Sequence, residues 1–114
     1  MNIELAVNEE LMDSMKLDIK DVSCSLTSAN DLCVRGKIVA KDGYDYVNGH
    51  LMVSGDILDK DGKVLMTIKD WTSKILGISR YDLFDLSCCA IHRFIDMKHI
   101  ACIKIYPVLN MNLS

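Results

Sequence analysis

The chain has 114 residues, a formal net charge of −3, 50% hydrophobic residues and 25% charged residues. This length fits a single domain, residues 1–114, with one core, and the composition is that of a folded globular protein rather than a disordered one. The small negative charge argues against binding to a nucleic-acid backbone or an anionic membrane. No segment approaches the roughly 20 consecutive apolar residues of a membrane-spanning helix.

The first ten residues lack the basic start and the unbroken apolar core of a secretory signal. The cytoplasm is therefore the expected location, and export after removal of a leader stays open as an alternative. The cysteines form an odd set without a C-x-x-C pair, at positions 24, 33, 88, 89 and 102. This set predicts reduced, partly buried thiols rather than a disulfide framework or a zinc ribbon.

The N-terminal part of the chain predicts three strands and one ambiguous segment. Residues 2–7 alternate apolar and polar side chains, which is a weak strand pattern. A short helix capped by Asn8 is one of two interpretations of residues 8–16. In residues 17–26 the apolar positions change parity after position 19, which predicts one strand bent by a β-bulge. Residues 27–31 predict a polar turn.

The clearest local prediction is a β-hairpin between Leu51 and Ile68. Its two apolar runs flank the sequence Asp59-Lys60-Asp61-Gly62. Gly62 can adopt the positive φ of a two-residue primed turn, or of a type I turn with a following bulge. Either aspartate can accept hydrogen bonds from nearby backbone amides.

The other elements complete the predicted fold. Residues 32–40 predict a strand, 41–49 a loop, 72–79 a helical turn or a loop, and 81–89 another strand. A last strand is predicted over residues 98–106, ended by Pro107, because proline cannot donate to a ladder. Six or seven short strands without strand–helix alternation predict an all-β protein, an antiparallel β-sandwich.

Part of the chain resembles a known family. The runs Leu32-Cys-Val-Arg-Gly-Lys-Ile-Val and Leu51-Met-Val-Ser-Gly-Asp-Ile-Leu-Asp-Lys-Asp-Gly-Lys-Val-Leu, with the strand around Leu83-Phe84, resemble FxLYD-type domains of bacteria and archaea. Where that family has an aromatic-x-Leu-Tyr-Asp run, this chain has Ile57-Leu58-Asp59. The resemblance covers residues 32–86. It implies an immunoglobulin-like β-sandwich that serves as an accessory or interaction module, without catalytic residues.

Two places in the chain carry residues that could bind a metal ion. The first is Asp59-x-Asp61-Gly62, which is similar to the start of a calcium loop, but no helices flank it, so a plain turn is favoured. His50 is the only imidazole in the first half of the chain. Asp42 and Asp45 could join a cation site only if their loop lay at the same end of the sandwich as the hairpin turn.

The second place is the region of Cys88, Cys89, His92 and His99, which has the densest set of nitrogen and sulfur ligands. In a strand, residues 88 and 92 share a face and 89 points away, so a zinc site would need His99 or Cys102 to complete it. Ordinary edge or loop residues are favoured. We therefore predict no metal, no cofactor and no catalytic residue.

Enzyme and nucleic-acid signatures are missing. The chain has no glycine-rich phosphate loop and no G-x-S-x-G run. Tyr44 and Tyr46 lie beside aspartates, which would repel phosphate rather than help bases to stack. The strands 51–58 and 100–106 are apolar in both parities, which is typical of strands covered on both faces.

These observations favour a noncatalytic protein-interaction or structural accessory module. We expect it to form a homo-oligomer, or to bind a protein partner, through an outer sheet face or an open edge. The alternative is a small metal- or ligand-binding protein that uses the Cys88, Cys89, His92 and His99 region.

Overall fold

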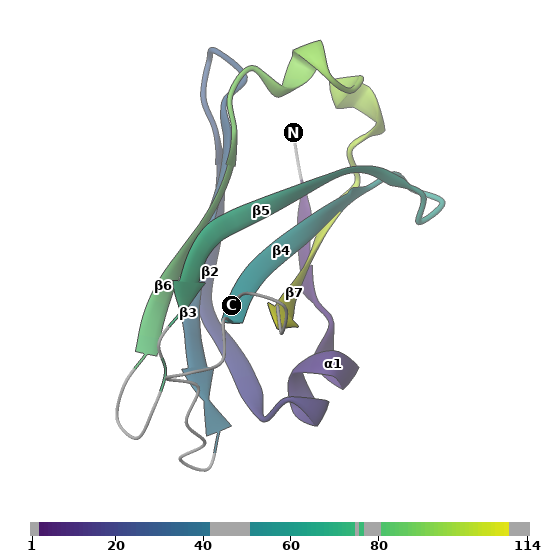
Figure 1. Cartoon of the computed structure of the whole chain (residues 1–114). Helices are drawn as coiled ribbons and strands as arrows, with labels where there is room; N and C mark the ends of the chain where they lie inside the picture. The colour runs from purple at the N-terminus through teal and green to yellow at the C-terminus, as the bar shows by residue number, and fades with distance from the viewer. Residues whose placement is uncertain (1–2, 42–50, 75, 77–80, 110–114) are drawn as a thin grey trace.

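A computed structural model describes residues 3–41, 51–74, 76 and 81–109 (Figure 1). In these residues seven strands form two packed sheets, accompanied by one short α-helix. The elements in chain order are β1 (Glu4–Val7), α1 (Glu9–Ser14), β2 (Leu17–Leu26), β3 (Leu32–Ala40), β4 (Leu51–Leu58), β5 (Val64–Lys74), β6 (Tyr81–Cys88), the 3₁₀ turns η2 (Ile91–Arg93) and η3 (Met97–His99), and β7 (Cys102–Leu109).

The two sheets have the strand orders β1-β7-β4-β5 and β2-β3-β6. The three-stranded sheet is antiparallel, but β1 pairs with β7 in parallel, so the four-stranded sheet is mixed. The prediction of a wholly antiparallel sandwich is therefore wrong for β1. Its partner lies almost a whole chain length away, a pairing that no local pattern reports. In an immunoglobulin constant-type domain the first and last strands lie in different sheets, whereas here they are neighbours.

The predicted hairpin is confirmed as the pair β4–β5. Gly62 has φ +82°, its N–H donates to the Asp59 carbonyl over 3.0 Å, and the Asp59 N–H donates to the Lys63 carbonyl. These bonds select the type I turn with a following bulge over the two-residue turn. The Asp59 Oδ1 atom accepts the N–H groups of Asp61 and Lys63, each at 2.9 Å.

In the N-terminal part, the structure selects one of two open interpretations and confirms one prediction. The ambiguous segment contains a helix, α1, with the Asn8 Oδ1 atom accepting the Leu11 N–H and with Met12 buried. β2 carries the predicted bulge, since its register with β3 shifts between Lys20 and Ser23 and Asp21 has φ +54°.

The last strand differs from its prediction at both ends. It begins at Cys102, because η3 occupies part of the segment before it, and it runs past Pro107 to Leu109. The Asn8 N–H donates to the Ile105 carbonyl, so Ile105 and Pro107 direct their backbone groups toward β1. β1 has ended by that point, so the proline removes no ladder bond.

The predicted helical turn or loop at residues 72–79 is wrong for residues 72–74, which belong to β5. The remaining residues of that segment lie outside the described residues, apart from position 76. Of the loop predicted over residues 41–49, residues 42–49 also lie outside them.

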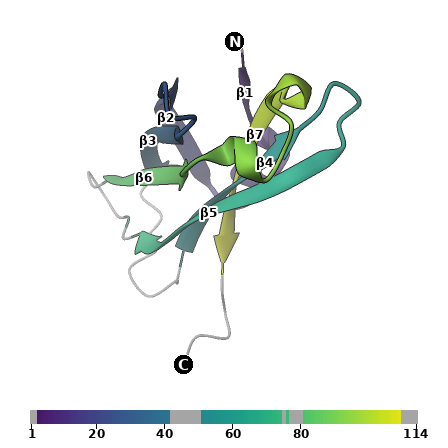
Figure 2. The ribbon, with the colours of Figure 1, turned by 90° about the horizontal axis from the view of Figure 1, so that it is seen from above.

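The core lies between the two sheets. It consists of the buried hydrophobic residues Met12, Leu17, Leu32, Val34, Ile38, Leu51, Val53, Ile57, Ile68, Leu76, Phe84, Leu86, Ile91, Ile100, Ile103 and Ile105. Viewed from above, β5 extends from its own sheet toward β6 (Figure 2), and the two strands are in contact without being paired in a ladder. In the described part of the chain, no helix has the length and apolar character needed to cross a membrane.

Candidate functional site

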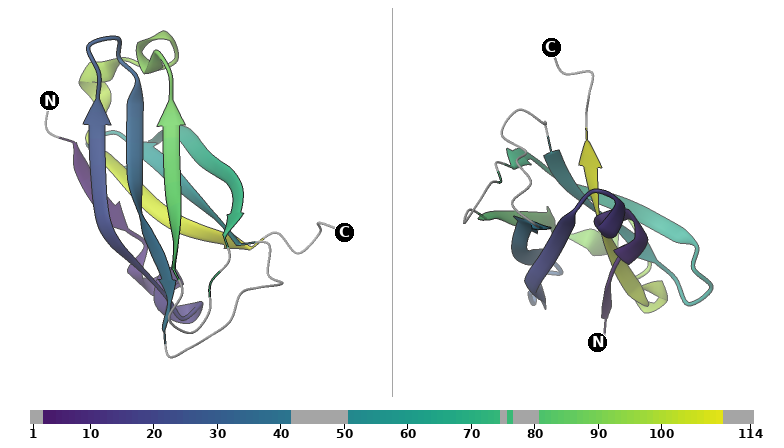
Figure 3. Two further views of the ribbon diagram at one scale, coloured as in Figure 1. Left: turned by 90° about the vertical axis from the view of Figure 1, so that its left-hand side faces the viewer. Right: turned by 90° about the horizontal axis from the view of Figure 1, so that it is seen from below.

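The outer face of the three-stranded sheet carries exposed large hydrophobic side chains. Tyr81 is 53% exposed and Leu83 is 59% exposed, and both alternate along β6 with the buried residues Phe84 and Leu86. This sheet faces the viewer in Figure 3, left, with β6 between β3 and β5. Water-exposed tyrosine and leucine two residues apart on one face form an apolar patch, which we call the β6 patch.

An open depression of about 640 Å³ adjoins the β6 patch. Its lining comes from four strands, namely Asp21 of β2, Arg35, Gly36 and Lys37 of β3, Asp70, Thr72 and Lys74 of β5, and Leu83, Phe84 and Asp85 of β6. Three acidic and three basic side chains are thus among the lining residues. How these charges pair decides what the depression can bind.

The least exposed charges in the depression are Asp70 and Lys74. The Lys74 Nζ atom lies 2.7 Å from the Asp70 Oδ2 atom, and the two side chains are only 4% and 10% exposed for lysine and aspartate. Residues four apart in a regular strand would be too distant for this contact. Here Asp70 pairs with Val53 and Lys74 with Leu51, so β5 has two more residues than β4 between these positions and bulges. The bulge brings the two side chains together.

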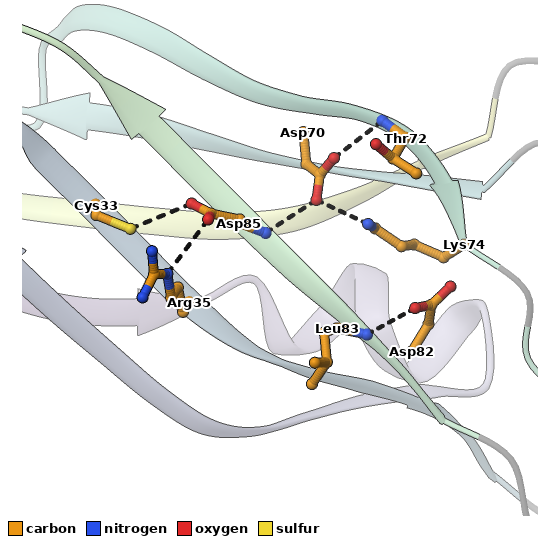
Figure 4. A network of polar contacts seen from close by, with 8 residues as sticks. All are labelled: Cys33, Arg35, Asp70, Thr72, Lys74, Asp82, Leu83 and Asp85. Atoms are coloured by element: carbon orange, nitrogen blue, oxygen red, sulfur yellow. Dashed lines mark hydrogen bonds and ion pairs between the residues drawn. The ribbon is translucent and has the colours of Figure 1, made fainter.

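The Asp70 carboxylate also links β5 to β6 along the line where the two strands meet, which we call the β5–β6 seam (Figure 4). It accepts the N–H of Asp85 on β6 and the N–H of Thr72 on its own strand, each at 2.9 Å. Burial alone would raise the pKa of Asp70, but the hydrogen bonds from Lys74 and from the two backbone amides outweigh burial and hold that pKa below its usual value. Asp70 is therefore an ionised, fully engaged carboxylate at neutral pH.

The other four charges also pair among themselves, at the surface. Arg35 Nε lies 3.2 Å from the Asp85 Oδ2 atom, and Lys37 Nζ lies 3.4 Å from the Asp21 Oδ2 atom. Lys37 Nζ is in addition 4.8 Å from the centre of the Tyr81 ring. The six charges of the depression thus form three neutral pairs, which leave no net charge to attract an ionic ligand.

Cys33 belongs to the same network, since its Sγ atom lies 3.2 Å from the Asp85 Oδ1 atom (Figure 4). Partial burial, together with the nearby Asp85 carboxylate, raises the pKa of the Cys33 thiol. The thiol therefore stays protonated at neutral pH and is not activated as a nucleophile.

The sequence-predicted ligand cluster is not assembled. β6 ends at Cys88, Ala90 adopts a left-handed conformation (φ +50°), and η2 begins at Ile91, so residues 88 and 92 do not share a strand face. The turn is fixed because the Ala90 N–H donates to Asp31 and the Ile91 side chain is buried. Cys89, His92 and His99 are exposed. Among the described residues, no three His, Cys, Asp or Glu side chains lie close enough together to hold a metal ion.

The Asp59-x-Asp61-Gly62 sequence, which is similar to the start of a calcium loop, forms the hairpin turn. One Asp59 oxygen is occupied by the turn's own amides, as described above. A hollow of about 330 Å³ lies between this turn and η3, lined in part by Asp61, Lys98 and His99. Asp42, Asp45, Tyr44, Tyr46 and His50 lie outside the described residues.

Sequence reasoning missed the Asp70–Lys74 pair and the β6 patch. An Asp-x-x-x-Lys spacing brings charges together in a helix, not in a regular strand, so only knowledge of the bulge would have found the pair. The strands with apolar residues on both faces correspond to β4 and β7, and these are the two inner strands of the four-stranded sheet. None of the large hydrophobic residues exposed in the described part of the chain lies on β4, whereas Tyr81 and Leu83 both lie on β6.

The fold and the site define a small, mostly β protein with two packed sheets in a sandwich-like arrangement. No protein-family model matches the chain, and no curated protein matches it either. Among solved structures, the crystal structure of Campylobacter jejuni cj0090 is similar, with a TM-score of 0.48 and 13% sequence identity over 96% of this chain and 100% of that chain.

Proposed function

We propose that this protein is a noncatalytic interaction module that binds a partner protein through the β6 patch. The exposure of Tyr81 and Leu83 carries the proposal. Contact of large apolar side chains with water is unfavourable, and a partner that covers them removes this contact. The partner that fits is a protein surface with an apolar side chain at its centre. Its polar groups would face the exposed Arg35–Asp85 pair at the rim.

The chemistry of the depression supports binding rather than catalysis. A catalytic acid, base or nucleophile needs a pKa that is tuned to its task and a free lone pair or proton. The shifts at Asp70 and Cys33 run the other way, since they hold the carboxylate ionised and the thiol protonated. The Asp70 oxygens are occupied by three donors.

The immunoglobulin-like and FxLYD-type assignments stay proposals. The hairpin with its Asp59-x-Asp61-Gly62 turn supports them. The neighbouring first and last strands count against an immunoglobulin strand order. A cytoplasmic location also remains a proposal.

The test compares three forms of the protein as immobilised bait for extracts of the source cells. Leu83→Lys places a charge in the centre of the β6 patch, at a position that is already exposed and so leaves the fold intact. Val64→Lys is the matched control, because Val64 is 49% exposed and lies beside the hairpin turn, away from the patch. Bound proteins are quantified by mass spectrometry.

A protein retained by the parent and by Val64→Lys but reduced at least tenfold by Leu83→Lys would support the proposal. Its direct binding would then be measured with the purified pair. If the three baits retain the same proteins in the same amounts, the β6 patch is not a docking surface and the proposal is wrong.

A further inference from the structure

The four edge strands of the two sheets differ in how open they are to pairing with another strand. β1 has only four residues, and β5 is interrupted by the bulge between Asp70 and Lys74. On β6, the Asp85 N–H donates to Asp70 and the Leu83 N–H donates to the Asp82 side chain. Short strands, bulges and charged side chains at the edge are the features by which natural sheets avoid pairing.

β2 is protected over its first half only. There the Ile19 N–H donates to the Asp18 side chain, and the bulge at Asp21 follows. The second half, Val22-Ser23-Cys24-Ser25-Leu26, has no charged residue, and its ladder with β3 is regular from Ser23 onward. In the described part of the chain, no side chain accepts a hydrogen bond from the N–H of Val22, Cys24 or Leu26.

The direction of these amides follows from the ladder. The Thr27 N–H donates to the Asp31 carbonyl on the β3 side, so Ser25 and Ser23 also direct their backbone groups toward β3. Neighbouring residues in a strand point their N–H groups to opposite edges, and Val22, Cys24 and Leu26 therefore direct theirs away from the sheet. The side chains of these three residues are half-buried at the margin of the core.

We infer that a second copy of this chain pairs with residues 22–26 of β2, antiparallel and around a two-fold axis at Cys24. Such pairing is self-complementary, because each copy offers the same outward donors and acceptors. It places Ser23 opposite Ser25 of the second copy. It also places Asp21 opposite Thr27 and Lys20 opposite Ser28 of the second copy, so no like charges meet.

The dimer also covers the side chains of Val22, Cys24 and Leu26, which in the single chain are half-buried at the edge of the core and partly in contact with water. Five residues make a short edge, so the dimer dissociates on dilution. The inference does not depend on the β6 patch, which lies on the opposite edge strand of the same sheet (Figure 3).

The test uses two double variants at exposed serines. Ser23→Lys/Ser25→Lys puts a lysine opposite a lysine across the two-fold axis, twice. Ser23→Lys/Ser25→Glu puts a lysine opposite a glutamate, twice, with the same positions changed. Both serines are exposed, so the folded monomer tolerates either change. The mass of each protein is measured by light scattering over a concentration series.

We expect the parent to shift from monomer to dimer as its concentration rises. The Lys/Lys variant stays a monomer at concentrations at least tenfold above the parent's transition, and the Lys/Glu variant dimerises like the parent or more strongly. In the parent, we also expect amide hydrogen exchange at Val22, Cys24 and Leu26 to slow at high concentration, because pairing in the dimer protects these N–H groups.

A parent that is monomeric throughout overturns the inference, and so does equal behaviour of the two variants. Leu83→Lys, measured in the same series, separates this inference from the proposed function. A dimer that survives Leu83→Lys but not Lys/Lys uses β2, whereas a dimer lost only with Leu83→Lys uses the β6 patch and contradicts pairing through β2.

Discussion

Asp70 is the residue on which most interactions of the candidate site converge. Its carboxylate joins Lys74, the bulged part of β5 and the edge of β6, with three donors within 2.9 Å. A buried ion pair adds little to stability relative to an apolar pair of the same shape, but removing one partner leaves the other charge buried and unpaired. The consequences of changing Asp70 are therefore large and specific.

We expect Asp70→Asn to lower the free energy of unfolding by about 3–5 kcal/mol, because the Lys74 ammonium loses its Asp70 counter-charge while it stays 4% exposed. Urea unfolding followed by circular dichroism measures the change. The matched control is Asp85→Asn, which removes a carboxylate from the exposed Arg35 pair and costs about 1 kcal/mol or less. Equal losses in the two variants would show that the Asp70–Lys74 pair is not effectively buried.

Gly36 allows the closest packing of β3 against a core aromatic ring. A Cβ atom added there would lie 2.7 Å from Cζ and 2.8 Å from Cε1 of Phe84, whose side chain is buried. We expect Gly36→Ala to lower the free energy of unfolding by about 1–3 kcal/mol through overpacking. The measurement is a double-mutant cycle with Phe84→Leu, in which the loss caused by alanine shrinks once the ring is gone. An unchanged loss would point to backbone effects instead.

At the scale of elements, the hairpin β4–β5 depends on one aspartate side chain. Asp59 Oδ1 accepts two amides of the turn, while the backbone of Gly62 supplies the positive φ. We expect Asp59→Ala to cost about 1–2 kcal/mol, since two hydrogen bonds of ordinary strength are lost at an exposed site where water replaces them in part. Asp61→Ala is the control, because among the described residues Asp61 takes part in the turn through its backbone N–H and not through its side chain. Thermal unfolding of the two variants is the check, and similar melting temperatures would contradict the assigned role.

The elements that could be predicted are those whose signals are local. The Asp59–Gly62 turn and the parity change in β2 act within a few residues, and the structure confirms both. The Asn8 cap is equally local, and the structure selects the helical one of the two interpretations of its segment. The parallel partner of β1 and the continuation of β7 through Pro107 depend on which strand lies alongside, so no local pattern contains them. The ion pair of the site was missed for a related reason, since it needs a bulge that only the β4 register reveals.

At the scale of the whole molecule, the two sheets are held together at one side by the contact between β5 and β6, where the Asp70 carboxylate accepts the Asp85 N–H. The pKa of Asp70 is lowered in the folded protein, whereas the unfolded chain has the ordinary value of about 3.9. The stability that this carboxylate contributes is therefore fully present above about pH 4 and is lost as the pH falls through the folded-state pKa.

This linkage predicts how a change at Lys74 moves acid unfolding. Lys74→Met removes one of the hydrogen bonds that lower the pKa of Asp70, while burial, which raises it, remains. We expect the midpoint of acid unfolding to move to higher pH, followed by circular dichroism at fixed temperature. Lys37→Met removes an exposed partner of Asp21 and serves as the control, with an unchanged midpoint. If both variants unfold at the parent's midpoint, acid unfolding begins elsewhere and the β5–β6 seam does not limit the acid stability of the fold.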